Sequence, residues 1–139
     1  DLNDASQAGV KIALILRGIC CLIPGQKYSR NIRVTRIVDT FLEHARIWYF
    51  GNGGNPKLFL GSPDWMRRNL YRRIEAVTPI LDPDAKQELI DMLSIQLSDK
   101  RKACFVDENL HNCWKSAHPL KEKVRSQYTF YEYLKERIE

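Results

Sequence analysis

The sequence lacks a long apolar run, which argues against a membrane-spanning helix. The apolar stretch Ile12–Leu16 is far shorter than the roughly 20 residues that such a helix needs. The first residues, DLNDASQAGVKI, also lack an initiator methionine and the basic and apolar regions of a signal peptide. We therefore expect a piece of a longer protein, a single domain over residues 1–139 whose preceding domains are absent.

Two familiar kinds of site are also missing. The four cysteines form neither a CxxC pair nor a zinc pattern with histidine, so we expect reduced, mostly buried thiols in a cytosolic protein. The glycine-rich stretch GNGGNP has no following Lys-Ser or Lys-Thr, and it precedes a strand-like run instead of a helix. It therefore predicts a turn and not a phosphate-binding loop.

The composition that remains is that of a soluble globular protein with a basic surface. Hydrophobic residues make up 44% of the chain and charged residues 28%, and the formal net charge is +5. A positive surface favours an anionic partner such as phosphate, a nucleotide, nucleic acid or an acidic membrane. Many basic proteins bind no such partner, so the charge alone leaves a plain solvated surface equally open.

Apolar patterns along the chain predict alternating helices and strands. Predicted helices cover residues 2–8, 33–42, 83–98 and 123–139, and predicted strands cover 10–16, 46–50, 57–60, 74–80 and 103–106. The second helix rests on apolar residues at helical spacing, from Val34 to Leu42, and leads up to His44. The alternation predicts an α/β layered domain.

Side chains that could carry chemistry stand at the ends of these elements. In chain order they are Arg17-Gly18, His44, Arg46, Gly61-Ser62 and Asn69. A histidine, a cation two residues later, and then Gly-Ser and Asn follow the spacing of the phospholipase D motif, HxK(x)nD…GSxN. Since side chains alternate along a strand, we expect His44 and Arg46 to face one phosphate.

These residue types suit phosphoryl transfer. Histidine can attack phosphorus or pass a proton, because its unperturbed pKa lies near neutrality. A guanidinium supplies a planar fork for nonbridging phosphate oxygens. The chain departs from the phospholipase pattern in two ways, since Arg46 replaces lysine and residues 50–52 lack the expected aspartate.

Longer stretches of the sequence indicate a more specific family. Strings such as LRGICCL, FLEH and DWMRRN closely resemble the C-terminal domain of the long, phospholipase-D-like polyphosphate kinases of bacteria. The resemblance runs from about Ala5 to Leu110 and extends loosely into the predicted final helix. It implies a phospholipase-D-like layered domain, with a mixed β-sheet flanked by helices.

The resemblance also implies an activity and an active site that is shared with the preceding domain. The family transfers the terminal phosphate of ATP to a growing inorganic polyphosphate chain, reversibly and with Mg²⁺. Arg17 and His44 would contact the nucleotide phosphates, with His44 as general acid/base or transition-state stabiliser. The phosphorylated histidine and the Mg²⁺ site would belong to the preceding domain. This chain would then supply half of an active site and be inactive alone.

The same resemblance sets the expected partners and location. We expect ATP, ADP and inorganic polyphosphate as partners, a homo-oligomer as the full-length protein, and no specific nucleic acid. The expected location is the bacterial cytoplasm, with peripheral membrane association left open.

Weaker candidates for phosphate binding are Ser62, Asp64, Asn69 and Arg68. Asp64 alternatively caps the turn before Trp65. The basic cluster, defined as Arg67, Arg68, Arg72 and Arg73, is either a solvated face or a track for polyphosphate. His111 and His118 are expected to be ordinary surface residues.

Two other functions stay open. One is a phospholipase-D-like phosphodiesterase half-site, against which the missing aspartate and lysine argue. The other is a noncatalytic module that holds polyphosphate or nucleic acid on its basic face. Such a module would bind with a steep salt dependence and would be indifferent to the loss of Arg17 or His44.

Overall fold

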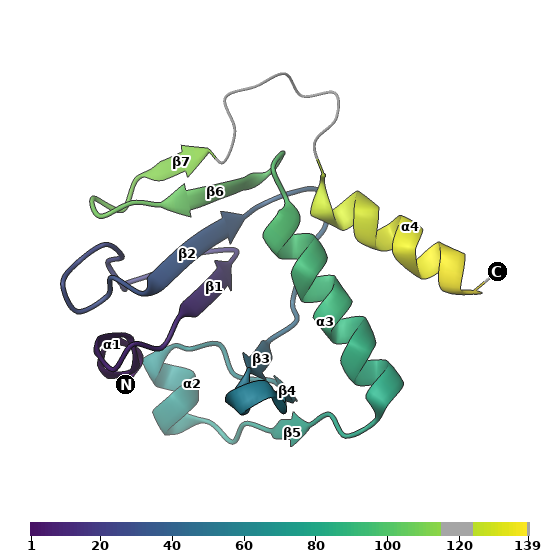
Figure 1. Ribbon diagram of the computed structural model, residues 1–139, viewed down its shortest axis with the longest axis horizontal. Helices are drawn as coiled ribbons and strands as arrows, with labels where there is room; N and C mark the ends of the chain where they lie inside the picture. Colours follow the sequence, from purple (N-terminus) through teal and green to yellow (C-terminus); the bar gives the residue numbers. More distant parts are fainter. Residues whose placement is uncertain (115–123, 139) are drawn as a thin grey trace. The chain divides into compact units, whose positions relative to one another are not determined.

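A computed structural model describes residues 1–114 and 124–138 of the chain (Figure 1). The chain forms two compact units, each with its own sheet. Unit 1 comprises Asp1–Phe41 and Leu93–Glu139, and unit 2 comprises Leu42–Met92. This division reflects local compactness, and the single domain expected over residues 1–139 stays a prediction.

Unit 1 contains a mixed four-stranded sheet. Its strands are β1 (Ile12–Leu16), β2 (Ile32–Ile37), β6 (Ala103–Val106) and β7 (Asn112–Trp114), in the order β1-β2-β6-β7. β1 runs parallel to β2, whereas the other two pairs are antiparallel. Ile32, Val34 and Val106 form the buried core, against which Leu14 and Leu16 pack. The apolar run that predicts β1 therefore supplies one wall of this core.

Unit 2 is built on an antiparallel meander. Its strands are β3 (Ile47–Phe50), β4 (Lys57–Gly61) and β5 (Val77–Pro79). The β3–β4 connection contains a short 3-10 turn over Asn52–Gly54, in which Gly53 and Gly54 have φ values of 62° and 93°. Glycine adopts this left-handed region without steric cost, so GNGGNP forms the predicted turn.

The described residues also form four α-helices. They are α1 (Leu2–Gln7), α2 (Arg67–Arg72), α3 (Pro83–Ser98) and α4 (Ser126–Ile138). α3 begins where the sequence predicts it, because Asp82 accepts a hydrogen bond from the Ala85 backbone N–H at 2.8 Å and Pro83 fits the first helical turn. Helices and a mixed sheet together confirm the α/β prediction.

The predicted helix over 33–42 is wrong, because this segment contains β2 and then an irregular stretch. The residues that suggested a helical face do not form one, since Val38 and Leu42 are 62% and 79% exposed. β-branched residues dominate Ile32–Ile37, and pairing with β1 on one side and β6 on the other settles the strand. The short elements α2 and β7 were not predicted.

The cysteines are only partly as expected. All four are free, but Cys21 and Cys113 are exposed and only Cys104 is fully buried, so the expectation of mostly buried thiols is wrong. Burial raises the pKa of the Cys104 thiol, which keeps it protonated and unreactive. Within residues 1–114 and 124–138, no helix has the length and apolar character needed to cross a membrane.

Candidate active site

His44 and Arg46 contact each other in the irregular segment before β3. Arg46 Nη1 lies 2.6 Å from His44 Nδ1 and also donates to the His44 carbonyl oxygen at 3.0 Å. Arg46 Nη2 lies 3.4 Å from His44 Nε2. A guanidinium can only donate, so the close Nδ1 atom is the acceptor. An imidazole that accepts at Nδ1 in its neutral form has its proton on Nε2, the nitrogen beside Arg46 Nη2, and His44 as a residue is exposed.

Asp64 holds the other side of the Arg46 guanidinium. Its Oδ1 accepts hydrogen bonds from Arg46 Nε at 3.1 Å and from Nη2 at 2.9 Å. The Arg46 side chain is 19% exposed, so this ion pair is partly shielded from water. The chain lacks the aspartate that the motif has after its first strand. The loop after β4 nevertheless places a carboxylate beside Arg46. Asp64, Arg46 and His44 form a chain of contacts within unit 2.

Ser62 is already engaged by its neighbours in the chain. Its hydroxyl donates to a Glu75 carboxylate oxygen and accepts a hydrogen bond from the Ala76 backbone N–H at 3.1 Å. These contacts fix the end of β4 against the start of β5. The predicted phosphate contact of Ser62 stays a prediction. Glu75 was not predicted as a partner of Ser62, because nothing in its immediate neighbours marks it as one.

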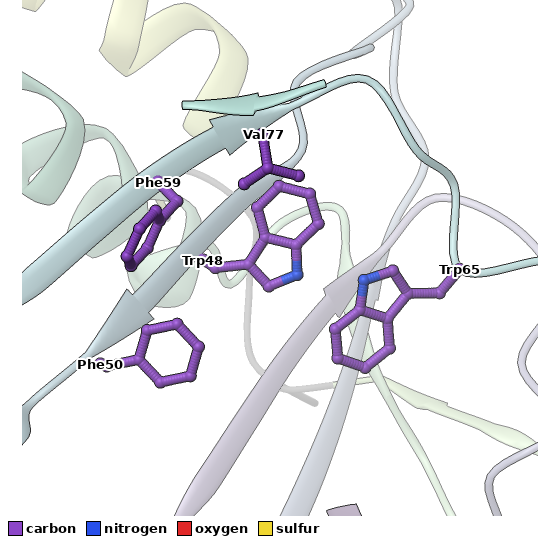
Figure 2. A pocket seen from close by; sticks show the side chains of 5 residues that line it. All are labelled: Trp48, Phe50, Phe59, Trp65 and Val77. Carbon is purple, nitrogen blue, oxygen red and sulfur yellow. The ribbon is translucent and has the colours of Figure 1, made fainter. Parts of the chain in front are cut away.

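The glycine of the Gly-Ser pair has a packing role. A Cβ atom on Gly61 would lie 2.5 Å from the Trp48 ring, so only glycine allows this ring to cross β4. Trp48 lies beside a hollow of about 360 Å³, lined also by Phe50, Phe59, Trp65 and Val77. Figure 2 shows the rings of Trp48 and Trp65 on opposite sides of this hollow. Trp65 directly follows Asp64, so its position is tied to the Arg46 contact.

α2 carries the weaker candidates. Asn69 is 4% exposed, and its Oδ1 atom has no hydrogen-bond partner within the described part of the chain. A buried amide oxygen without a partner is uncommon and is normally satisfied by another group. Arg68 and the rest of the basic cluster are exposed, which suits both a solvated face and a polyphosphate track. The predicted phosphate contacts of Asn69 and Arg68 stay predictions.

Arg17 lies in unit 1, directly after β1 and exposed to solvent. Arg36 Nε donates to the Gly18 carbonyl oxygen at 3.2 Å and so restrains the turn that carries Arg17. Because β1 and β2 are parallel, with Leu16 opposite Arg36, their carboxyl ends share one edge. The chain that leads to His44 leaves β2 at this same edge. A common phosphate site for Arg17 and His44 stays a prediction.

The remaining predicted features lie elsewhere. His111 is exposed and its Nδ1 lies 3.7 Å from an Asp107 carboxylate oxygen, whereas His118 lies outside the described residues. Among residues 1–114 and 124–138, no three His, Cys, Asp or Glu side chains gather in a way that could hold a metal ion.

Comparison with known proteins identifies relatives. The family model for "Polyphosphate kinase C-terminal domain 2" matches residues 1–127. The polyphosphate kinase of Synechocystis sp. (strain ATCC 27184 / PCC 6803 / Kazusa) is 58% identical over 103 residues, which are 73% of this chain and 14% of that protein. The polyphosphate kinase of Escherichia coli (strain K12) is 46% identical over 135 residues, which are 96% of this chain and 20% of that protein.

A solved structure agrees with these sequence matches. The crystal structure of polyphosphate kinase from Porphyromonas gingivalis matches with a TM-score of 0.91 and 56% sequence identity, and the match covers 98% of this chain and 21% of that chain. This chain thus spans about a fifth of the solved protein's length, and the phospholipase-D-like fold class is confirmed. With the family model matching most of the sequence, the chain belongs to the polyphosphate kinase family, in which it corresponds to C-terminal domain 2.

Proposed function

We propose that this chain is the C-terminal catalytic part of a polyphosphate kinase. The full-length enzyme transfers the terminal phosphate of ATP to a growing polyphosphate chain, and the reverse reaction returns phosphate to ADP. The observation that carries the proposal is the contact chain from Asp64 through Arg46 to the exposed His44. Relatives named polyphosphate kinase at 46% to 58% identity support the same assignment.

His44 is the general acid/base in this proposal. Its imidazole can pass a proton to or from the oxygen that leaves or enters the phosphoryl group, and the Arg46 contact holds the ring in place. Phosphoryl transfer needs little more from the protein than positioning, charge compensation and a proton carrier. Arg17 supplies positive charge to the nonbridging oxygens. Arg46 stands beside the phosphate and also holds the imidazole.

This chain supplies only part of the catalytic machinery. We propose that the metal ligands and the phosphorylated histidine lie in another part of the full-length protein, as the family resemblance implies. Mg²⁺ supplies charge neutralisation to the phosphates when it is bound. The isolated chain is then inactive. We further propose a cytoplasmic, homo-oligomeric full-length enzyme, with ATP, ADP and polyphosphate as its partners.

The exposed basic cluster suits a polyanionic product. Arg67, Arg68 and Arg72 lie on α2, which begins three residues after Asp64, and Arg73 directly follows that helix. Positive charges at this spacing can bind successive phosphates of a chain that leaves the site. This role adds length-dependent binding to the proposed transfer and requires no catalytic step from these arginines.

The experiment compares polyphosphate synthesis by the full-length enzyme with His44 or Gln at this position. Wild type, His44→Gln and the control His111→Gln are assayed with Mg²⁺ and ATP, after melting temperatures confirm equal folding. We expect His44→Gln to lower kcat by about 10²- to 10⁴-fold, the usual contribution of a positioned acid/base. His111→Gln should keep the wild-type rate, because His111 contacts only the nearby Asp107 carboxylate in the described part of the chain. Equal rates for all three proteins would reject the assignment of His44.

The same proteins separate the two other functions. Hydrolysis of bis(p-nitrophenyl) phosphate that is lost in His44→Gln would favour a phosphodiesterase. Polyphosphate binding that falls steeply with salt but is equal in wild type, Arg17→Ala and His44→Gln would favour a noncatalytic module. The proposed kinase predicts neither result.

A further inference from the structure

Residues at the start of α4 form hydrogen bonds and an ion pair with the segment of chain between β2 and His44. Arg125, the residue before α4, and Gln127, in its first turn, contact Asp39, Thr40 and Phe41 across 85 or 86 positions of sequence. We call these contacts the α4 clamp. All of its residues belong to unit 1. Nothing in the phosphoryl-transfer site described above requires α4, so the clamp needs a separate explanation.

The first half of the clamp is a buried ion pair. The Asp39 side chain is 1% exposed and accepts two hydrogen bonds from Arg125, from Nε at 2.8 Å and from Nη2 at 2.6 Å. Arg125 Nη2 also donates to the Thr40 hydroxyl at 2.8 Å. Two parallel bonds between a guanidinium and a carboxylate restrict direction as well as distance. The chain is therefore held firmly two residues after β2 ends.

The second half of the clamp holds the backbone itself. The Phe41 N–H donates to Gln127 Oε1 at 2.8 Å, and Gln127 Nε2 donates to the Phe41 carbonyl oxygen at 2.7 Å. One side-chain amide thus satisfies both backbone groups of a residue outside any strand. The Phe41 ring also lies 6.0 Å from the Tyr128 ring. These contacts fix the direction in which the chain leaves Phe41.

The clamp is anchored to the sheet of unit 1. Asp99 is fully buried, and its Oδ2 accepts a hydrogen bond from the Ser126 backbone N–H at 2.8 Å. Its Oδ1 accepts from the backbone N–H groups of Lys102 and Ala103, at the start of β6. The first turn of α4 is thus tied to the strand next to β2. A rigid support of this kind is what a precisely placed functional group needs.

We infer that Arg125 and Gln127 are positioning residues for His44. His44 lies three residues after Phe41 and two before Arg46, in a segment without regular secondary structure. The α4 clamp holds this segment at Phe41, and the Asp64 contact holds it at Arg46. The chain is thus restrained at a residue on each side of His44. The inference rests on the proposed function, since His44 must take part in phosphoryl transfer for its position to affect the rate.

The test removes the hydrogen bonds between the Gln127 side chain and the Phe41 backbone with little change in side-chain volume. Gln127→Met in the full-length kinase loses both hydrogen bonds to Phe41, whereas the matched control Gln87→Met loses a hydrogen bond to Asp91 on the exposed surface of α3. We expect Gln127→Met to lower kcat between about 10- and 100-fold at an unchanged KM for ATP, because displacement of a catalytic group by about 1 Å can cost up to 10²-fold. Gln87→Met should keep the wild-type kcat.

Two further readouts separate positioning from plain structural support. Amide hydrogen exchange of residues 42–45 should become faster in Gln127→Met and stay unchanged in Gln87→Met, at equal melting temperatures. In a His44→Gln background, Gln127→Met should lower the remaining rate no further, because the group that it positions is gone. Unchanged exchange at 42–45, or an equal loss of rate with and without His44, would overturn the inference.

The outcomes also distinguish this inference from the proposed function. A wild-type enzyme that makes no polyphosphate, or a His44→Gln variant with the wild-type rate, would reject the proposed function and the clamp's role with it. An active wild type, an impaired His44→Gln and a fully active Gln127→Met would reject the clamp's role alone.

Discussion

The two units use their polar groups differently. In unit 1, Asp39 and Asp99 have side chains that are buried and fully engaged by Arg125 and by backbone N–H groups. In unit 2, His44 is exposed and Asp64 is 37% exposed in its side chain, although both are in contact with Arg46. Buried, satisfied charges stabilise a fold, whereas exposed and oriented ones remain available to a ligand.

The two units also differ in how many apolar side chains they bury. Of the buried apolar residues in the described part of the chain, only Leu58 and Pro63 belong to unit 2. The opposite face of its sheet carries the aromatic hollow of Figure 2, in which Phe50 and Trp65 are more than half exposed. Unit 1 therefore holds most of the buried apolar residues, whereas unit 2 exposes more of its aromatic and polar side chains.

The largest effect should come from the core of unit 2. Leu58→Ala truncates its largest fully buried side chain, so we expect the free energy of unfolding to fall by about 2–5 kcal/mol. The control Leu81→Ala, at a position 81% exposed, should change stability by less than about 0.5 kcal/mol. Chemical denaturation measures both. Equal small effects would mean that unit 2 has no core of its own.

A somewhat smaller loss of stability should follow the removal of Asp99. Asp99→Ala leaves buried backbone N–H groups at Lys102, Ala103 and Ser126 without their acceptor, which should cost about 1–3 kcal/mol. Asp64→Ala breaks a partly exposed ion pair and should cost no more than about 1 kcal/mol. Thermal melts of the two variants test this order, and a reversed order would contradict the contrast between the two units.

Low pH should lower the stability of unit 1, because it protonates the carboxylates of Asp39 and Asp99. Hydrogen bonds from Arg125 hold the pKa of Asp39 below its ordinary value of 3.8. Burial alone would raise the pKa of Asp99, but hydrogen bonds from Ser126, Lys102 and Ala103 outweigh it and the pKa is lowered. A lowered pKa contributes stability above the ordinary value, and this contribution is lost as the pH falls through the folded value.

The measurement is the free energy of unfolding from pH 7 down to pH 2. We expect a plateau above about pH 5 and a fall below about pH 4, with a shallower fall in Asp39→Asn, which has no carboxylate to protonate. A matched substitution at the exposed Asp84 should leave the slope unchanged. A slope in Asp39→Asn as steep as in wild type would show that the clamp's ion pair does not carry the acid sensitivity.

The smallest effect should be seen in the rate when Asp64 is changed. Asp64→Asn keeps the shape of the side chain but loses its charge, so the Arg46 guanidinium is held less firmly beside His44. We expect kcat for polyphosphate synthesis to fall about tenfold, which corresponds to about 1.4 kcal/mol in the barrier. Unchanged kcat would remove Asp64 from the account and leave Arg46 as the sole support of the imidazole.

Local sequence signals explain what was predictable in these elements. α3 follows from Asp82, Pro83 and the helical spacing of its apolar residues, and these signals are all within the helix and its cap. β2 was mistaken for part of a helix, because Val34 and Ile37 fit both spacings and only the neighbouring strands decide between them. α2 has six residues and an exposed basic surface, which gives no periodic signal.

The contacts of the candidate site also differ in whether the sequence could predict them. The sequence predicts that His44 and Arg46 lie on one side of a strand, but both lie in the irregular segment before β3 and contact each other directly. The contact between Arg46 and Asp64 joins two loops across 18 positions, and the clamp joins Asp39 to Arg125 across 86. Such contacts depend on where tertiary structure brings the segments, so spacing in the sequence could not reveal them.

Chemical rescue of His44 tests the central claim most directly. His44→Gly in the full-length kinase is assayed for polyphosphate synthesis with and without added imidazole, beside Arg17→Ala. If the exposed imidazole carries the proton, added imidazole should restore part of the activity of His44→Gly and leave Arg17→Ala unchanged. A His44→Gly enzyme with the wild-type rate, or one whose lost activity imidazole does not restore, would contradict the claim that His44 acts through its chemistry.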